Sequence, residues 1–105
     1  MLSDVIHDLV DGECIIAAAL IDADGFTLER TSIDLKPNEL AAIFDICESH
    51  DIISVVTTEN ILTARLFSTN HTLIIQTPKN GNVGMARLRL EQSSKLIVNY
   101  LEQLR

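Results

Sequence analysis

The chain has 105 residues, a hydrophobic content of 47% and a charged content of 22%, which predict one folded domain rather than a disordered chain. It carries 15 acidic and 8 basic residues, for a net charge of -7. Because so acidic a chain repels phosphate groups and no basic cluster offsets this, we expect it to bind neither nucleic acid nor an anionic membrane surface.

The two cysteines and the N-terminal residues indicate the cellular compartment. Cys14 and Cys47 stand at apolar positions of expected elements, so we expect buried, reduced thiols with no disulfide and no metal site. The N-terminus lacks a basic region followed by an apolar one, and no stretch approaches the roughly 20 apolar residues of a membrane span. We therefore expect a soluble, cytoplasmic protein without membrane insertion.

The first expected element is a short helix, capped by Ser3 and ending near Gly12. An apolar run without polar alternation then extends from Cys14 to Ile21, and we expect a strand over 14–22. A strand that is apolar on both faces needs cover on both faces. The alternative is a short buried helix over 14–21, which its three alanines would tolerate.

A turn and a second strand follow the first strand directly. The turn is Asp22-Ala23-Asp24-Gly25, in which Gly25 can adopt positive φ at no steric cost. The second strand is expected over 26–32. We expect the resulting hairpin at the centre of a sheet flanked by helices.

The next expected element is a helix that Pro37 opens and that extends to about Ser49. Apolar side chains cover more than one side of this helix, which indicates that it is packed against a partner as well as against its own sheet. These residues are Leu40, Ala41, Ala42, Ile43, Phe44, Ile46 and Cys47.

Three strands and a final helix complete the chain. The β-branched residues predict strands over 52–58, 61–68 and 72–78, with Pro78 ending the last. Asn82 is placed to cap the final helix. In that helix an apolar position recurs every seven residues, and a favourable i,i+4 ion pair is expected on the solvent side. The apolar positions are Val83, Leu90, Ile97 and Leu104, and the expected pair is Glu91 with Lys95.

The expected order is helix-strand-strand-helix-strand-strand-strand-helix, an α+β fold with a five-stranded antiparallel sheet. The third strand follows a helix and so can lie at a sheet edge. It carries Ile52, Ile53, Val55 and Val56, with no proline or lysine. A long apolar edge strand promotes association unless something pairs with it. Two copies that pair edge to edge about a two-fold axis are the simplest solution.

This order of elements resembles the Roadblock/dynein light chain family over essentially the whole chain, as a single-domain member of bacterial or archaeal type. The resemblance rests on the helix ending near Gly12, on the apolar strand leading into Asp22-Ala23-Asp24-Gly25 and on the strand-helix-strand succession. It extends to the segment from Leu73 through the loop to Leu88. The pattern consists of apolar positions and a turn rather than of catalytic residues.

The resemblance implies a homodimer, or a heterodimer with a paralogue, in which the third strands pair and the second helices pack together. The implied interface consists of Ala41, Phe44, Ile52, Ile53, Val55, Val56 and Thr57. The family is non-catalytic by itself, so no enzyme activity, catalytic residue, cofactor or metal is expected. Its members commonly serve as scaffolds or regulators of Ras-like small GTPases.

Other motifs carry little chemistry. Counted from Asp22 as the first position of a calcium loop, the fifth, sixth and twelfth positions are Phe26, Thr27 and Ile33, so the EF-hand pattern fails. The segment 81–84 precedes a helix and could hold an anion, but a role as loop and cap is favoured. The histidines His7, His50 and His71 show no triad spacing. Nothing distinguishes Arg30, Arg65, Arg87 and Arg89 as an arginine finger.

Two further functions stay open beside that of a GTPase regulator. A ligand-sensing domain or enzyme on a similar sheet would need a concave pocket with convergent polar groups. A purely structural assembly subunit would form a larger fixed complex without nucleotide dependence.

Overall fold

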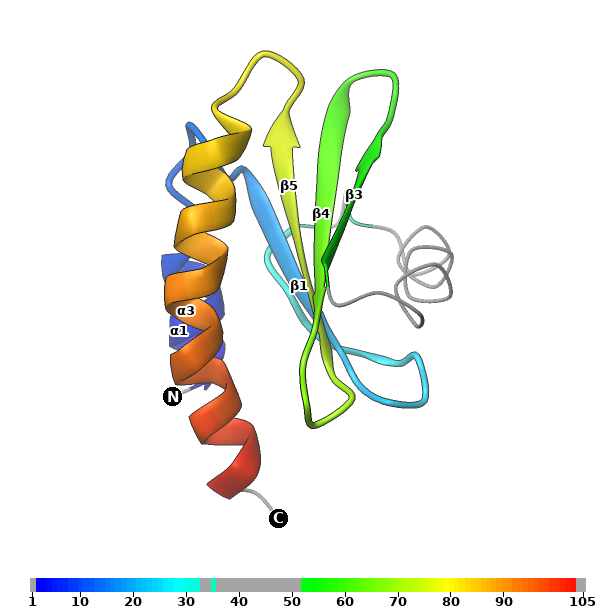
Figure 1. The fold of residues 1–105 in the computed structure, drawn as a ribbon, viewed down its shortest axis with the longest axis vertical. Coiled ribbons are helices and arrows are strands. Elements are labelled where there is room, and N and C mark those ends of the chain that lie inside the picture. Colours follow the sequence, from blue (N-terminus) through cyan, green and yellow to red (C-terminus); the bar gives the residue numbers. More distant parts are fainter. Residues whose placement is uncertain (1, 33–34, 36–51, 104–105) are drawn as a thin grey trace.

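The structure, a computed structural model, describes residues 2–32, 35 and 52–103. Its elements form a five-stranded antiparallel sheet with two helices on one face (Figure 1). They are α1 (Leu2–Asp8), β1 (Ala17–Ile21), β2 (Thr27–Arg30), β3 (Ile52–Val56), β4 (Asn60–Leu66), β5 (Thr72–Pro78) and α3 (Val83–Gln103). The predicted α+β fold with a five-stranded antiparallel sheet is therefore confirmed, while the helix predicted over 37–49 lies outside the described residues.

The strand order is β2-β1-β5-β4-β3. We predicted that the first hairpin lies at the centre of the sheet, and this is wrong. The central strand is β5, and β2 lies at an edge. The reason is that β5, from the far end of the chain, pairs with the open side of β1 along its whole length, from Ala17 opposite Gln76 to Ile21 opposite Thr72. The helix alternative for 14–21 is wrong, because residues 17–21 form β1 and residues 14–16 are not helical.

All five residues of β1 are buried, as an apolar strand without alternation requires. Successive side chains point to opposite faces, so β1 contributes to two separate clusters. Towards the helices, Ala18 and Leu20 pack with Leu73 and Ile75 of β5 and with the buried face of α3. On the opposite face, Ala17, Ala19 and Ile21 pack with Leu35, Leu62, Ala64 and Ile74.

The chain between α1 and β1 is organised by Asp11. Its Oδ1 accepts hydrogen bonds from the backbone N–H groups of Glu13, Cys14 and Ile15, at 2.8, 2.9 and 3.0 Å. These groups cannot at the same time join a sheet, so β1 begins at Ala17 and not at residue 14 as predicted. Cys14 therefore precedes the strand and is only partly buried, contrary to the expectation of a core thiol in a strand.

The turn between β1 and β2 has the predicted conformation. Gly25 has a φ of 90°, and Oδ1 of Asp22 accepts hydrogen bonds from the N–H groups of Asp24 and Phe26, at 3.0 and 2.9 Å. The side chain of Asp22 thus stabilises the turn itself.

Helix α3 begins at the predicted cap. Oδ1 of Asn82 accepts a hydrogen bond from the N–H of Met85 at 3.0 Å, which is the N-cap geometry. The buried residues of α3 recur with helical period and complete the core on the helix side of the sheet (Figure 1). They are Ala86, Leu90, Ser94, Ile97 and Leu101. Neither described helix combines the length and the apolar character needed to cross a membrane.

Candidate interaction surface

Strand β3 lies at the edge of the sheet, as we predicted. It pairs with β4 on one side, from Ile52 opposite Arg65 to Val56 opposite Ile61. Within the described residues, no strand pairs with its other side. An open edge presents backbone donors and acceptors in a row, which is a template for pairing with another chain.

The direction of the backbone groups along β3 follows from its hairpin with β4. The N–H of Thr57 donates to the carbonyl oxygen of Asn60 at 2.8 Å, so residue 57 faces β4. In an antiparallel pair this orientation alternates, so Ile53 and Val55 also face β4. The N–H and C=O groups of Ile52, Ser54 and Val56 therefore point to the open edge.

The side chains of β3 are unequally exposed. Val56 is 66% exposed, whereas Ile52, Ile53 and Val55 are partly buried. Thr57 is exposed, and its hydroxyl donates to the carbonyl oxygen of Asn60 at 2.9 Å. The predicted interface residues Ile52, Ile53, Val55, Val56 and Thr57 thus all lie in or directly after this edge strand. The other two predicted interface residues, Ala41 and Phe44, lie outside the described residues.

On the face of the sheet that α1 and α3 cover, neither of these described helices packs extensively against β3 or β4. Helix α1 packs against β1 and β2, and α3 packs against α1 and β5. The pairing register places Ile52, Ser54 and Val56 on this side, because Ser54 opposes Thr63 and Thr63 opposes Ile75 of the helix-side core. We call the β3 and β4 side chains on this side the uncovered strip. Its members are Ile52, Ser54, Val56, Ile61, Thr63 and Arg65, of which Thr63 is fully buried and Ile52 packs against the edge of the helix-side core.

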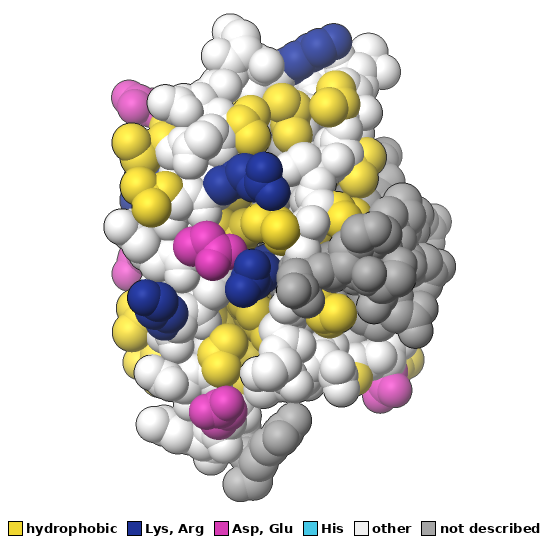
Figure 2. Space-filling view, in the orientation of Figure 1, with side chains coloured by type: hydrophobic (Ala, Val, Ile, Leu, Met, Phe, Trp, Pro, Cys, Tyr) yellow, Lys and Arg dark blue, Asp and Glu magenta, His cyan; other side chains and the backbone are white. Residues whose placement is uncertain are grey.

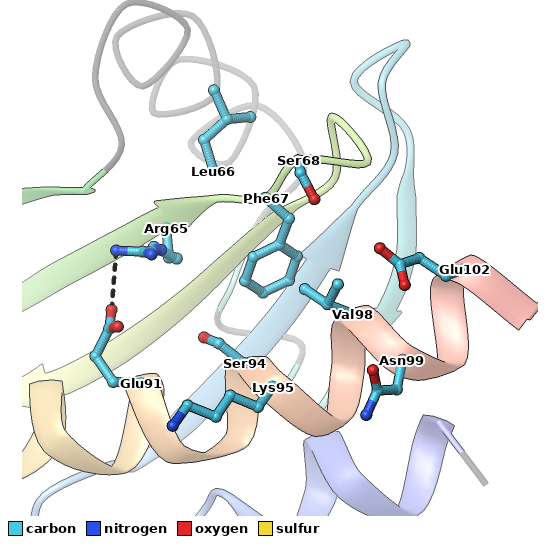
Figure 3. A pocket seen from close by; sticks show the side chains of 10 residues that line it. All are labelled: Arg65, Leu66, Phe67, Ser68, Glu91, Ser94, Lys95, Val98, Asn99 and Glu102. Atoms are coloured by element: carbon cyan, nitrogen blue, oxygen red, sulfur yellow. Dashed lines mark ion pairs between the residues drawn. The ribbon is translucent and has the colours of Figure 1, made fainter.

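A hollow of about 490 Å³ lies at one end of the uncovered strip, between α3 and the end of β4 (Figure 3). Phe67 and Val98 give it an apolar interior, with Arg65 and Lys95 towards one end and Glu102 towards the other. The remaining lining residues are Leu66, Ser68, Glu91, Ser94 and Asn99. Its polar groups are spread around the rim and do not converge, unlike those of a small-molecule site.

The ion pair predicted between Glu91 and Lys95 is wrong. Glu91 instead lies 3.0 Å from Arg65, between Oε1 and Nη1. The reason is the position of Glu91 on the side of α3 that faces β4, where a cation of the sheet is within reach. Oε1 of Glu91 makes no hydrogen bond within the described structure, so the contact is an ion pair without good hydrogen-bond geometry. Both side chains are about a third to half exposed, and such pairs contribute little to stability.

The four arginines that the sequence left equivalent have different environments. Arg30 donates to the carbonyl oxygen of Leu35 at 3.1 Å, Arg65 pairs with Glu91, and Arg89 pairs with Asp11. Within the described residues, Arg87 has neither an ion pair nor a hydrogen bond, and the same holds for Lys95. Figure 2 shows one face of the molecule, on which Lys and Arg side chains are spaced among hydrophobic ones, with acidic side chains between them.

Titratable groups within the described residues form no reactive constellation. The pKa of Asp11 is lowered, mainly by the hydrogen bond from the backbone N–H of Ile15 and further by the charge of Arg89, which is a structural arrangement. Nε2 of His7 lies 3.2 Å from Oε1 of Glu29, and Nδ1 of His71 lies 3.0 Å from Oγ1 of Thr69. No three acidic, cysteine or histidine side chains of the described ranges are placed to hold a metal ion.

Comparison with solved structures shows a common fold. Myxococcus xanthus MglB is 14% identical with a TM-score of 0.80, covering 97% of this chain and 95% of that chain. A Roadblock/LC7 domain from Streptomyces avermitilis is 12% identical with a TM-score of 0.80, covering 95% and 97%. A structure described as MglB with tetrameric arrangement is 13% identical with a TM-score of 0.76, covering 97% and 88%.

No protein-family model and no curated protein sequence matches the chain. At 12 to 14% identity, the structural likeness shows the fold alone. It confirms the Roadblock-like fold on which the sequence resemblance rested.

Sequence reasoning missed the hollow and the uncovered strip beside it. Both depend on where α3 crosses the sheet, and the periodicity of α3 shows only which of its faces is buried. A partial signal was present: Arg65 is the one charged residue of β4, and a charged residue within a strand calls for a partner from another element.

Proposed function

Since the chain has a Roadblock fold, we propose that it is a non-catalytic dimeric adaptor that binds and regulates a Ras-like small GTPase. The observation that carries this proposal is the combination of that fold with an open, apolar β3 edge. The edge supplies a means of dimerisation, and the Roadblock resemblance supplies the class of partner.

The proposed dimer joins the two β3 edges antiparallel about a two-fold axis perpendicular to the sheet. Each copy contributes the outward N–H and C=O groups of Ile52, Ser54 and Val56, so the pairing is self-complementary, as a two-fold interface requires. The ten strands then form one continuous sheet. The tetrameric arrangement described for one MglB structure supports the tendency of this fold to associate.

The chemistry of the described residues supports an adaptor more than an enzyme. The hollow between α3 and β4 lacks convergent polar groups, and the one lowered pKa belongs to Asp11, whose contacts are structural. Any influence on a GTPase is then exerted through binding, by stabilising one conformation of the partner more than the other.

Binding of the purified chain to candidate Ras-like GTPases tests the proposal. Each GTPase, encoded in the same genome, is loaded with GDP or with a non-hydrolysable GTP analogue and titrated by calorimetry. We expect one GTPase to bind, with affinities that differ between the two nucleotide states, and its hydrolysis rate is then measured with and without the chain. Absence of binding in both states for every Ras-like GTPase of the genome would refute the proposal.

A further inference from the structure

Helix α3 has an exposed face that carries no charge. Its six residues are all exposed, and none of them is Asp, Glu, Lys or Arg, although 22% of the chain is charged. Three are amides, and three are large hydrophobic side chains that are 45 to 54% exposed. Because the solvent face of a helix normally carries charged residues, the absence of charge here needs a physical reason. We call these residues the outer face of α3: Met85, Leu88, Gln92, Leu96, Asn99 and Gln103.

The outer face is directed away from the sheet. At 3.6 residues per turn, it lies opposite the buried residues of α3, and Figure 1 shows the sheet on the other side of this helix. Charged side chains of α3 lie on the two flanks instead. Lys95 and Glu102 line the hollow towards β4, and Arg89 on the other flank pairs with Asp11. The outer face is therefore an uncharged stripe between charged flanks.

The spacing of the outer face keeps it straight along α3. Residues 85, 88 and 92 recur eleven positions later as residues 96, 99 and 103. A repeat of eleven corresponds to about 3.67 residues per turn, close to the 3.6 of an undistorted helix. The stripe thus extends over 18 residue steps, about 27 Å, without winding around the helix. A second straight helix can pack along its whole length.

We propose that the outer face of α3 packs against the same face of a second copy of this chain, with the two helices antiparallel about a two-fold axis at Gln92. In this register Leu88 lies opposite Leu96 of the second copy, and Leu96 lies opposite its Leu88. Gln92 meets its own counterpart, and two identical amides can pair because each is both donor and acceptor. Met85 lies opposite Asn99. The face is self-complementary, as a two-fold contact requires.

The charges of α3 favour a second copy over a charged partner. A strongly charged segment would find no opposite charge on the outer face. Two chains with a net charge of -7 repel each other, but α3 has two acidic and three basic residues, so the acidic excess lies elsewhere. Like flanks meet in an antiparallel two-fold pair, so Lys95 comes within about 3 Å, along the axes, of the level of Glu91 of the second copy. Arg89, on the other flank, is neutralised by its own Asp11.

The size of the outer face limits what it can hold together. Its six residues are far fewer than the roughly 20–30 per side of a stable interface, so two single chains associate weakly. The next step rests on the proposed β3 dimer. Its two-fold axis is perpendicular to the sheet, so both outer faces are directed to the same side. Two dimers that face each other then form two α3 contacts at once, the second at a high effective concentration. We expect dimers at several micromolar and tetramers at several hundred micromolar.

Disulfide cross-linking tests the contact and its register. Gln92→Cys places a thiol opposite its counterpart, so mild oxidation at high concentration should give a covalent pair of twice 11.6 kDa. Leu88→Cys is the matched control, because its counterpart is eight residue steps away, about 12 Å along the axis, whereas disulfide-bonded Cα atoms lie within about 7 Å. A mixture of Leu88→Cys and Leu96→Cys should cross-link again. The unaltered chain gives the background from Cys14 and Cys47.

Light scattering over a hundredfold range of concentration tests the assembly. Leu88→Glu places charges in the proposed contact and keeps a good helix former. Leu28→Glu is the matched control, because Leu28 of β2 is 50% exposed and Leu88 is 51% exposed. We expect the mass of the wild type and of Leu28→Glu to rise from twice towards four times 11.6 kDa, and that of Leu88→Glu to stay at twice 11.6 kDa. Circular dichroism verifies that both variants are folded.

Three results would overturn the proposal. They are a wild-type mass that never exceeds the dimer, a tetramer that survives Leu88→Glu, and cross-linking of Gln92→Cys no greater than that of Leu88→Cys. Failure of the β3 dimer is distinguishable from these. If β3 pairing is wrong, Val56→Lys leaves the mass at several micromolar unchanged, whereas cross-linking of Gln92→Cys at high concentration still reports the α3 contact.

Discussion

At the scale of single residues, Asp11 joins two parts of the chain that are far apart in sequence. Its Oδ1 accepts three backbone N–H groups of residues 13–15, and its Oδ2 pairs with Arg89 of α3. The carboxylate therefore fixes the path from α1 into β1 and ties it to α3. The hydrogen bond from the N–H of Ile15 is the largest cause of its lowered pKa.

We predict that Asp11→Ala destabilises the fold by about 1–2 kcal/mol at pH 7, because it removes a carboxylate that accepts several backbone hydrogen bonds. Asp11→Asn keeps an acceptor and should cost less. Since the folded pKa lies below the ordinary value of 3.8, the stabilisation is present above pH 3.8 and is lost as the pH falls through the folded pKa. Urea unfolding of the wild type and Asp11→Asn should thus give midpoints that differ at pH 7 and converge only as the pH falls below 3.8 and through the folded pKa of Asp11.

Equal midpoints of the wild type and Asp11→Asn at pH 7 would contradict this account. A third variant, Asp24→Asn, is the control. Asp24 is an exposed turn residue whose backbone N–H, and not its side chain, donates a hydrogen bond to Oδ1 of Asp22. Replacing its carboxylate should therefore have little effect on stability at either pH.

Residue-level prediction failed where the contact was long-range. Glu91 and Lys95 have the spacing of a helical ion pair, and sequence gives no reason to prefer another partner. Arg65 competes successfully because β4 lies beside that face of α3, which is known only once strand order and helix placement are known. By contrast, the cap at Asn82 and the turn at Gly25 depend on local geometry alone, and both were predicted from sequence.

At the scale of elements, α3 depends on its N-terminal cap more than most helices, because its first turn contains no acidic residue. Only Asn82 is observed to accept a side-chain hydrogen bond there within the described residues. We predict that Asn82→Ala destabilises the fold by about 1 kcal/mol. Asn82→Asp should match or exceed the wild type, because a carboxylate also interacts favourably with the helix dipole.

Urea unfolding at pH 7 measures both Asn82 variants. Asn80→Ala, two residues earlier and exposed, is the matched control and should change stability by less than the cap variant. If Asn82→Ala and Asn80→Ala were equally stable, the cap would contribute nothing, and packing of the buried face would account for α3 by itself.

Every described helix and strand was predicted from periodicity and turn residues, but their order in the sheet was not. The unbroken apolar run of β1 correctly predicted burial on both faces. It could not show that β5, about 50 residues later, is the neighbour of β1, because any apolar strand fits that position. The predicted start of β1 was early for a local reason, since Asp11 takes the N–H groups of 13–15 that a longer strand would use.

At the scale of the whole molecule, the described sheet has two edge strands, β2 and β3. They differ in how readily each can pair with a strand of another chain. Strand β2 has four residues and carries Glu29 and Arg30, and both its shortness and its charges discourage pairing. Strand β3 has five residues without a charge, and its outward backbone groups belong to Ile52, Ser54 and Val56. Self-association is therefore expected at β3.

We predict that Ser54→Pro converts the proposed dimer to a monomer that stays folded. Proline removes the outward N–H of residue 54, and proline is tolerated at edge positions whose N–H faces away from the sheet. Ser54→Ala keeps that N–H and loses only the contact between Ser54 Oγ and Thr63 Oγ1, at 3.1 Å, so it is the matched control. Light scattering should give twice 11.6 kDa for the wild type and Ser54→Ala, and 11.6 kDa for Ser54→Pro.

A second variant separates loss of pairing from loss of folding. Val56 is 66% exposed in the monomer, so Val56→Lys should leave the fold intact, but its charge would lie beside the β3 side chains of the second copy, and lysine on an edge strand disfavours pairing with another strand. We expect this variant to be monomeric at several micromolar with an unchanged circular dichroism spectrum. A dimer that survives both Ser54→Pro and Val56→Lys would show that the protein associates through a surface other than β3, because both changes act on that edge by independent means.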